Sequence, residues 1–140
     1  MRILYKAKAV SDGGREGKVR IENTPVEFQM AKPVEIGGSG KTGVNPEQLF
    51  AAGYAACFES ALSHVALRRK LTLNSASVAV EVGIGPNNQG GFKLVVSLTA
   101  TVSGVDQSTA EKLLQEAHQV CPYSNAIRGN VEVTLSARVG

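Results

Sequence analysis

Alternating apolar and polar residues predict strands in the first third of the chain. The alternation covers residues 2–10, 19–21 and 26–30. The breaks between these stretches carry turn-forming sequences, of which SDGG at 11–14 is the clearest. We therefore predict a small antiparallel sheet here.

The same alternation returns over residues 78–84 and 92–102, on either side of the sequence GPNNQGG. Glycine, proline and asparagine between two alternating stretches are typical of a hairpin turn, so these residues predict a β-hairpin. A last alternating stretch, residues 131–139, predicts a strand that closes the chain.

A long helix is predicted between the two groups of strands. It starts at the sequence NPEQLFAAGYAACF, in which Asn45 is a good N-cap, Pro46 suits the first helical position and Gln48 can complete a capping box. Residues 49–58 carry no charge on any side, whereas an ordinary surface helix has one polar face. We predict one helix over residues 46–70, with its first half covered all round.

Two further segments complete the order of elements. Residues 33–44 contain four glycines and no periodicity, which predicts a mobile loop leading into the long helix. Ser108 and Glu111 form a potential capping box for a second helix, which Pro122 ends at Cys121. The order βββ-α-ββ-α-β predicts an α+β fold in which antiparallel sheets pack around a long central apolar helix plus a second helix.

Composition limits the classes of function. The 140 residues fit one domain, residues 1–140, and no apolar stretch is long enough to span a membrane. The net charge of +3 is spread along the chain without interleaved aromatic residues, which argues against nucleic-acid binding. The N-terminus lacks the features of a signal peptide, so we expect a soluble, cytoplasmic protein.

The two cysteines, Cys57 and Cys121, have different settings. Cys57 lies about three turns into an apolar helix, too deep for the helix dipole to help form a thiolate, so its reaction would require a nearby cation. Cys121 lies at a helix C-terminus before Pro122, which suits a resolving thiol better than an attacking one. The alternative is that both are small buried hydrophobic residues without chemistry.

Three separated blocks carry a resemblance to a known family. They are GGREG at 13–17, NPEQLFAAGYAACF at 45–58 and CPYSNAIRGNVEV at 121–133. Together they resemble the organic hydroperoxide resistance (Ohr) branch of the Ohr/OsmC family, over nearly the whole chain. The departures are Val44 and Ile127, where the family commonly has threonine.

The resemblance implies a cytoplasmic thiol peroxidase that reduces organic and fatty-acid hydroperoxides in antioxidant defence. It also implies an α+β homodimer that binds no cofactor and is re-reduced by the lipoyl groups of a lipoylated protein. The resemblance makes Cys57 the peroxidatic cysteine, Cys121 the resolving cysteine with which it forms a disulfide, Arg15 the activating arginine and Glu47 its carboxylate partner. An arginine fork suits this role because it can hold a thiolate and a carboxylate at once.

Two readings from other classes compete with this one. Gly40, Lys41 and Thr42 resemble the end of a nucleotide-binding phosphate loop, but the pattern lacks its first glycine and the helix does not follow directly. The second is a metal-binding module, since two cysteines and two histidines could make a tetrahedral zinc site. Its residues would be Cys57, His64, His118 and Cys121, whose spacings match no common zinc framework.

Helix geometry predicts where the active site is assembled. The ten residues from Glu47 to Cys57 span about 15 Å along a helix, too far for Arg15 to touch both. Either the helix is broken near Gly53, or Arg15 and Glu47 reach Cys57 from a partner chain. We favour an intertwined dimer, because its interface would also cover the apolar first half of the helix.

Overall fold

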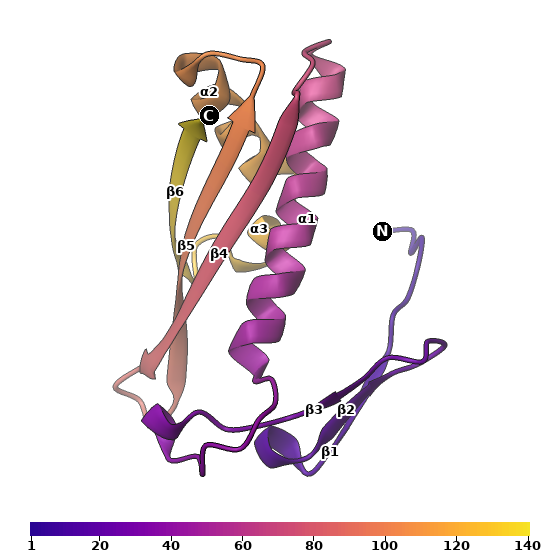
Figure 1. Cartoon of the computed structure of the whole chain (residues 1–140), viewed down its shortest axis with the longest axis vertical. Coiled ribbons are helices and arrows are strands. Elements are labelled where there is room, and N and C mark those ends of the chain that lie inside the picture. The colour runs from indigo at the N-terminus through magenta and orange to yellow at the C-terminus, as the bar shows by residue number, and fades with distance from the viewer. The chain divides into compact units, whose positions relative to one another are not determined.

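The computed structural model describes all of residues 1–140, which form two compact units, Met1–Leu49 and Phe50–Gly140. Figure 1 shows their helices and strands in chain order. Each unit is described in turn, and the long helix α1, Pro46–Arg68, begins at the end of the first and continues into the second.

The first unit is built on a three-stranded antiparallel sheet in the order β1-β2-β3. Its strands are β1 (Ala9–Asp12), β2 (Lys18–Ile21) and β3 (Glu27–Gln29). A 3-10 turn, Gly14–Glu16, connects β1 to β2, and Gly13 before it has φ +84°, a left-handed conformation that favours glycine. The predicted small antiparallel sheet is confirmed.

The first predicted strand is wrong over residues 2–8, which belong to no strand. The pairing register puts Ala9 opposite Ile21, the last residue of β2, so β2 offers no ladder partner for anything before Ala9. Side chains 1–8 are all exposed as well. Alternation alone does not make a strand when neither a partner strand nor a buried face is present.

The glycine-rich segment before α1 is irregular, as predicted, apart from a 3-10 turn at Val34–Ile36. Backbone hydrogen bonds join its end to the end of β3: the Ala31 N–H donates to the Val44 carbonyl at 2.8 Å, and the Val44 N–H donates to the Gln29 carbonyl at 3.0 Å. The mobility that we predicted for this loop stays a prediction.

Helix α1 begins as its sequence predicts. The Gln48 N–H donates to the Asn45 side-chain oxygen at 2.8 Å, and the Asn45 N–H donates to the Gln48 side-chain oxygen at 2.9 Å, which is a complete capping box. The helix then runs unbroken through Gly53 to Arg68. The predicted all-round burial is not met within one chain, because Ala52 and Ala56 are exposed.

The second unit contains a sheet in the order β4-β5-β6. The predicted hairpin is confirmed as β4 (Ser75–Pro86) and β5 (Phe92–Ser103), while β6 (Glu132–Val139) is the predicted final strand. The prediction of purely antiparallel sheets is wrong for β6, which pairs parallel to β5. A parallel neighbour requires a crossover connection, which the helices between β5 and β6 provide.

The helical connection between β5 and β6 differs from the prediction at two points. Helix α2 is Gln107–Val120, and its N-cap is Asp106, whose carboxylate accepts from the Thr109 N–H at 2.8 Å. The predicted cap, Ser108, lies inside the helix. The chain turns at Cys121, as predicted, but a further short helix follows at once, α3 (Pro122–Ile127), which uses the proline at its first position.

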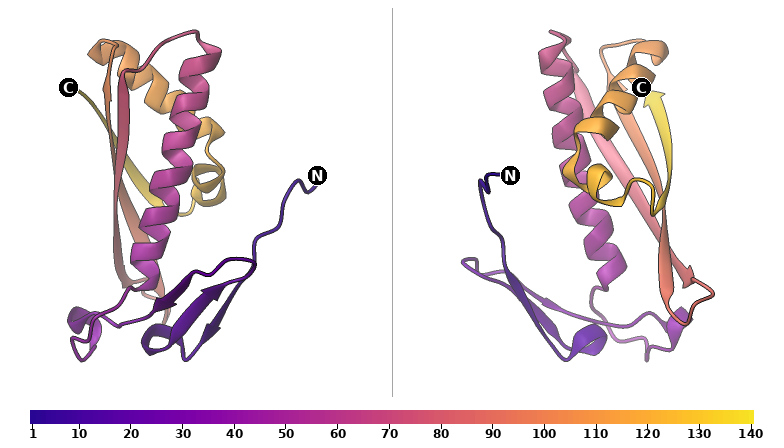
Figure 2. Two further views of the ribbon diagram at one scale, coloured as in Figure 1. Left: turned by 45° about the vertical axis from the view of Figure 1, so that its right-hand side comes forward. Right: turned by 180° about the vertical axis from the view of Figure 1, so that it is seen from behind.

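The main core lies on one face of the second sheet. Register places Val80, Leu98 and Leu135 side by side across the three strands, and the positions two residues away on each strand follow the same apolar pattern. Figure 2 shows this sheet nearly edge-on in its left view, with α1, α2 and α3 on the same side. Burying this face beneath the helices removes a continuous apolar surface from water.

The fold is therefore α+β, in agreement with the predicted order of elements. None of its helices has both the length and the apolar character needed to cross a lipid bilayer. The assignment of residues 1–140 to one domain stays a prediction.

Candidate active site

The two cysteines meet in the second unit. Cys57 projects from the middle of α1, and Cys121 lies at the junction of α2 and α3, where its ψ of 123° leaves the helical region before Pro122. Their sulfur atoms are 3.6 Å apart, with the Cys121 thiol donating to Cys57, and both are free thiols. Cys121 is completely buried and Cys57 is half-buried. Only a small movement separates this pair from disulfide contact distance.

The surroundings of Cys57 in this unit do not favour its thiolate. Burial is the largest effect and raises the pKa of the Cys57 thiol, and the neighbouring Cys121 raises it further. The backbone N–H of Tyr123 acts in the opposite direction, because it can donate to the charged sulfur. The net direction is upward, so activation of Cys57 requires a positive charge that these neighbours do not supply.

Arg15 and Glu47 meet in the first unit. Arg15 lies in the 3-10 turn between β1 and β2, and Glu47 lies in the first turn of α1. The guanidinium donates twice, from Nη1 to Oε2 at 2.8 Å and from Nη2 to Oε1 at 2.6 Å. This fork-to-fork geometry fixes the plane of the arginine as well as its position.

The pair is partly shielded from solvent, with 32% of the Arg15 side chain and 13% of the Glu47 side chain exposed. The hydrogen bonds from Arg15 hold the pKa of the Glu47 carboxyl below its usual value, while those to Glu47 raise the pKa of the Arg15 guanidinium. Both groups therefore stay charged at neutral pH, and Arg15 is held as a fixed cation.

The structure thus brings the four predicted site residues together as two pairs, one in each unit. It defines the geometry within each pair. The roles that the resemblance gives to Cys57, Cys121, Arg15 and Glu47 stay predictions, and the geometry of the pairs is the ground on which we argue them below.

Aromatic residues that the sequence analysis did not single out pack against one another between α1 and α3. Tyr123, the second residue of α3, packs at 5.8 Å between ring centroids on Tyr54 and at 6.1 Å on Phe50. A Cβ atom on Gly53 would approach the Tyr123 hydroxyl to 2.6 Å, so the glycine leaves room for this ring. The spacing of Phe50, Tyr54 and Phe58 along α1 was the signal that could have revealed this aromatic face.

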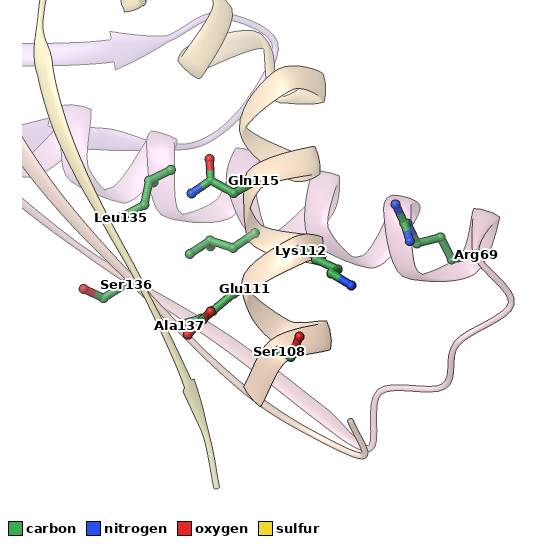
Figure 3. A pocket seen from close by; sticks show the side chains of 9 residues that line it. Arg69, Ser108, Glu111, Lys112, Gln115, Leu135, Ser136 and Ala137 are labelled. Atoms are coloured by element: carbon green, nitrogen blue, oxygen red, sulfur yellow. The ribbon is translucent and has the colours of Figure 1, made fainter. Parts of the chain in front are cut away.

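A hollow of about 370 Å³ opens beside Cys57. Its walls are mostly apolar, with His64 among the polar groups, and are formed by Cys57, Ser60, Ala61, His64, Val120 and Pro122. A larger hollow of about 710 Å³ lies between α2 and β6, where Lys112, Glu111 and Gln115 project from the helix (Figure 3). The larger one is lined by no cysteine, so of these two hollows the smaller one is the one that offers a ligand access to a thiol.

The nucleotide-binding reading finds no support in the first unit. The Lys41 ammonium, which would have to reach a phosphate, donates instead to the Glu16 carbonyl at 2.7 Å and lies 3.4 Å from the Glu16 carboxylate. The helix that should follow the loop directly begins only at Pro46.

The metal-binding reading also fails. No group of three or more histidine, cysteine, aspartate or glutamate side chains is arranged to hold a metal ion. His118 instead places its Nδ1 atom 2.9 Å from the Ser124 hydroxyl, while His64 is exposed.

Comparison with known proteins identifies the family. The family model described as OsmC-like protein matches residues 38–136. An organic hydroperoxide resistance protein of Xanthomonas axonopodis pv. citri is 48% identical over 136 residues, which cover 96% of this chain and 95% of the relative. The chain belongs to the Ohr/OsmC family.

Solved structures of the family agree with this fold over its full length. An organic hydroperoxide resistance protein from Legionella pneumophila is similar with a TM-score of 0.94 and 50% identity, covering 98% of this chain and 99% of the other. The corresponding protein from Elizabethkingia anophelis gives a TM-score of 0.95 at 46% identity, with both chains covered completely. The family resemblance of the sequence is confirmed.

Proposed function

We propose that this protein is a thiol-dependent peroxidase that reduces organic hydroperoxides to the corresponding alcohols. The observation that carries the proposal is the pair of free thiols 3.6 Å apart, one half-buried beside an apolar hollow and the other completely buried. Relatives that cover almost the whole chain are named organic hydroperoxide resistance proteins, which supports the same class of substrate.

The difference in burial supports an order for the two thiols. Cys57 is the one that a peroxide can reach, so its thiolate attacks the outer peroxide oxygen, the O–O bond breaks and the protonated alkoxide leaves as an alcohol. Cys57 is then a sulfenic acid. The Cys121 thiol attacks its sulfur, water leaves, and a Cys57–Cys121 disulfide forms.

Activation of Cys57 falls to Arg15, with Glu47 keeping the guanidinium in place. The thiol has a raised pKa among its own neighbours, and Arg15 is a fixed cation that its salt bridge already orients. Such a preorganised charge stabilises a thiolate without needing to reorganise during the reaction.

We further propose that the protein acts as a homodimer in which the partner chain supplies Arg15 and Glu47 to Cys57. Helix α1 is unbroken over Pro46–Arg68, which removes the alternative of a bend near Gly53. Ala52 and Ala56 leave an exposed apolar strip on this helix, and a second copy of the chain would cover it.

The reductant of the disulfide is proposed to be a dihydrolipoyl group on a lipoylated protein. One thiol of the dihydrolipoyl group attacks a sulfur of the Cys57–Cys121 disulfide and forms a mixed disulfide. The second lipoyl thiol then attacks the lipoyl sulfur of that bond, which closes the cyclic lipoyl disulfide and releases both protein cysteines as thiols. The mostly apolar walls beside Cys57 fit the hydrocarbon part of either a lipoyl group or an alkyl hydroperoxide.

A peroxidase assay tests the proposal. Purified protein should consume an alkyl hydroperoxide much faster than hydrogen peroxide, and dihydrolipoamide should sustain turnover better than a monothiol reductant. Equal rates with both peroxides would contradict the role of the apolar hollow. Absence of turnover with every peroxide and reductant would contradict the proposed activity itself.

A further inference from the structure

The sulfur contact is one of two side-chain hydrogen bonds that join α1 to Cys121 and α3. The Tyr54 hydroxyl lies 2.6 Å from the Ser124 hydroxyl, and the Cys57 and Cys121 sulfurs are 3.6 Å apart. Tyr54 precedes Cys57 by three residues on α1, and Ser124 follows Cys121 by three residues. The two contacts therefore lie next to each other between the same two segments, separated by about one helical turn.

The contact between the Tyr54 and Ser124 hydroxyls is completely buried, and a third side chain, His118, extends it. Tyr54 and Ser124 are both 0% exposed, and His118 on α2 places Nδ1 2.9 Å from the Ser124 oxygen. Burial lowers the pKa of His118, and the charge of Arg128 lowers it further, so the imidazole is neutral at pH 7. Neutral Nδ1 can then accept from Ser124 while Ser124 accepts from Tyr54, which gives both hydroxyl protons an acceptor.

The segment that carries Cys121 is thus held from two helices. Tyr54 reaches it from α1 and His118 from α2, and the Arg128 guanidinium at the end of α3 donates to the His118 carbonyl and to the Asn125 side chain. None of these contacts involves a sulfur atom, and the peroxidase chemistry proposed above makes no use of them. Their common effect is to fix the position of the chain that starts at Cys121.

We propose that Tyr54 and Ser124, with His118 behind them, are positioning residues for the resolving thiol. The inference rests on the proposed function, because it concerns the second step, in which Cys121 attacks the Cys57 sulfenic acid. That attack competes with a second peroxide molecule, which would oxidise Cys57 further to a sulfinic acid. Holding α3 in place keeps the Cys121 sulfur within reach, and this proximity favours the disulfide.

The hydrogen bond between Tyr54 and Ser124 can be removed with little change in the shape of either side chain. Tyr54→Phe deletes one hydroxyl, and Ser124→Ala deletes the other. Loss of one buried hydrogen bond changes the population of the docked arrangement by on the order of tenfold, so disulfide formation should slow by about this factor. The double variant should be no worse than about the poorer single variant, because both changes remove the same contact.

Two measurements separate positioning from general damage. The first is the rate at which Cys57 reacts with an alkyl hydroperoxide in the first turnover. The second is the ratio of sulfinic acid to disulfide formed at a fixed excess of peroxide, read by intact mass. We expect the first to stay within about twofold of wild type and the second to rise by about tenfold in both single variants. Ser75→Ala is the matched control, because it breaks a serine–serine contact of 2.7 Å on the sheet without touching α3.

A lowered melting temperature with an unchanged ratio of sulfinic acid to disulfide would overturn the proposal, since the network would then be structural only. A rise of equal size in Ser75→Ala would do the same. Diamide keeps the test independent of the peroxidase proposal: one thiol adds to its N=N bond, and attack by the second thiol on that sulfur releases the hydrazine and forms the disulfide. If the protein proves inactive towards peroxides, slower closure with diamide in Tyr54→Phe would still support positioning, and unchanged closure would contradict it.

Discussion

The thiol pair and the ion pair are built from opposite kinds of interaction. Around Cys57 and Cys121, burial is the dominant influence, and it raises the pKa of Cys57. Around Arg15 and Glu47, paired hydrogen bonds dominate, and they lower the pKa of Glu47 and raise that of Arg15. One region therefore stabilises the neutral form of its reactive group, and the other stabilises charge.

Under the proposed mechanism, this difference means that neither region is sufficient by itself. A buried thiol with a raised pKa is a poor nucleophile, and a neutralised arginine salt bridge has no substrate chemistry of its own. The proposed mechanism requires the two pairs to act together, and the predictions below test that requirement.

The largest effect is expected from exchanging the two thiols for serine. Cys57→Ser should abolish turnover, because the accessible nucleophile is lost, whereas Cys121→Ser should still consume about one equivalent of hydroperoxide before Cys57 over-oxidises. Peroxide consumption in a single-turnover experiment and the mass of the product distinguish them. If Cys57→Ser kept the single turnover and Cys121→Ser lost it, the two roles would have to be exchanged.

Removal of the cation should have the next largest effect. Arg15→Ala should lower the rate of the peroxide step by on the order of 10²-fold and raise the apparent pKa of Cys57, because the thiolate loses its stabilising charge. Arg15→Lys should fall between this variant and wild type, since it keeps the charge and loses the fork. Alkylation of Cys57 followed against pH measures the change, and an unaltered titration in Arg15→Ala would remove arginine from the mechanism.

The long helix and the four site residues show what the sequence could predict. The cap of α1 is local, so Asn45 and Gln48 indicated its start correctly, and both bonds of the capping box are present. The site residues came from family resemblance, and the structure then brought them together in pairs. Without that resemblance, Arg15 and Glu47 would look like ordinary surface charges.

The elements that the sequence failed to predict depend on partners distant in the chain or on competition between similar local signals. The direction of β6 follows from its crossover, which strand alternation does not encode. Asp106 and Ser108 are both good N-caps, and Asp106 prevails while Glu111, the intended partner of Ser108, bonds to Gln107 at 3.0 Å. The Tyr54–Ser124 contact joins residues 70 positions apart and exists only once α3 has formed.

A third prediction concerns how the two regions are brought together. Mixing Cys57→Ser chains with Arg15→Ala chains under subunit exchange should restore activity, because one site in each mixed dimer regains every group if the partner supplies Arg15. With equal amounts and random exchange, about half of the dimers are mixed and each has one complete site, so about a quarter of wild-type activity should return. No recovery in verified mixed dimers would mean that each site is built within one chain.

The smallest expected effect is on stability, from Glu47→Gln. The folded-state pKa of Glu47 is lowered from about 4.5, chiefly by its hydrogen bonds from Arg15, so the pair stabilises the folded protein above that pH and loses this contribution as the pH falls through the lowered pKa. Because the Arg15 side chain is 32% exposed, solvent screening limits the contribution to about 1 kcal/mol or less. Glu47→Gln should therefore lower the free energy of unfolding in urea at pH 7 by about that amount, and the difference from wild type should shrink as the pH is lowered below about 4.5.

Glu22→Gln is the matched control, because its single contact with Lys8 is 3.5 Å long and more exposed, and it should change little at either pH. A difference between Glu47→Gln and wild type that persists unchanged in acid would show that the carboxylate acts through packing, and the contrast drawn here between a charged region and an apolar one would lose its electrostatic basis.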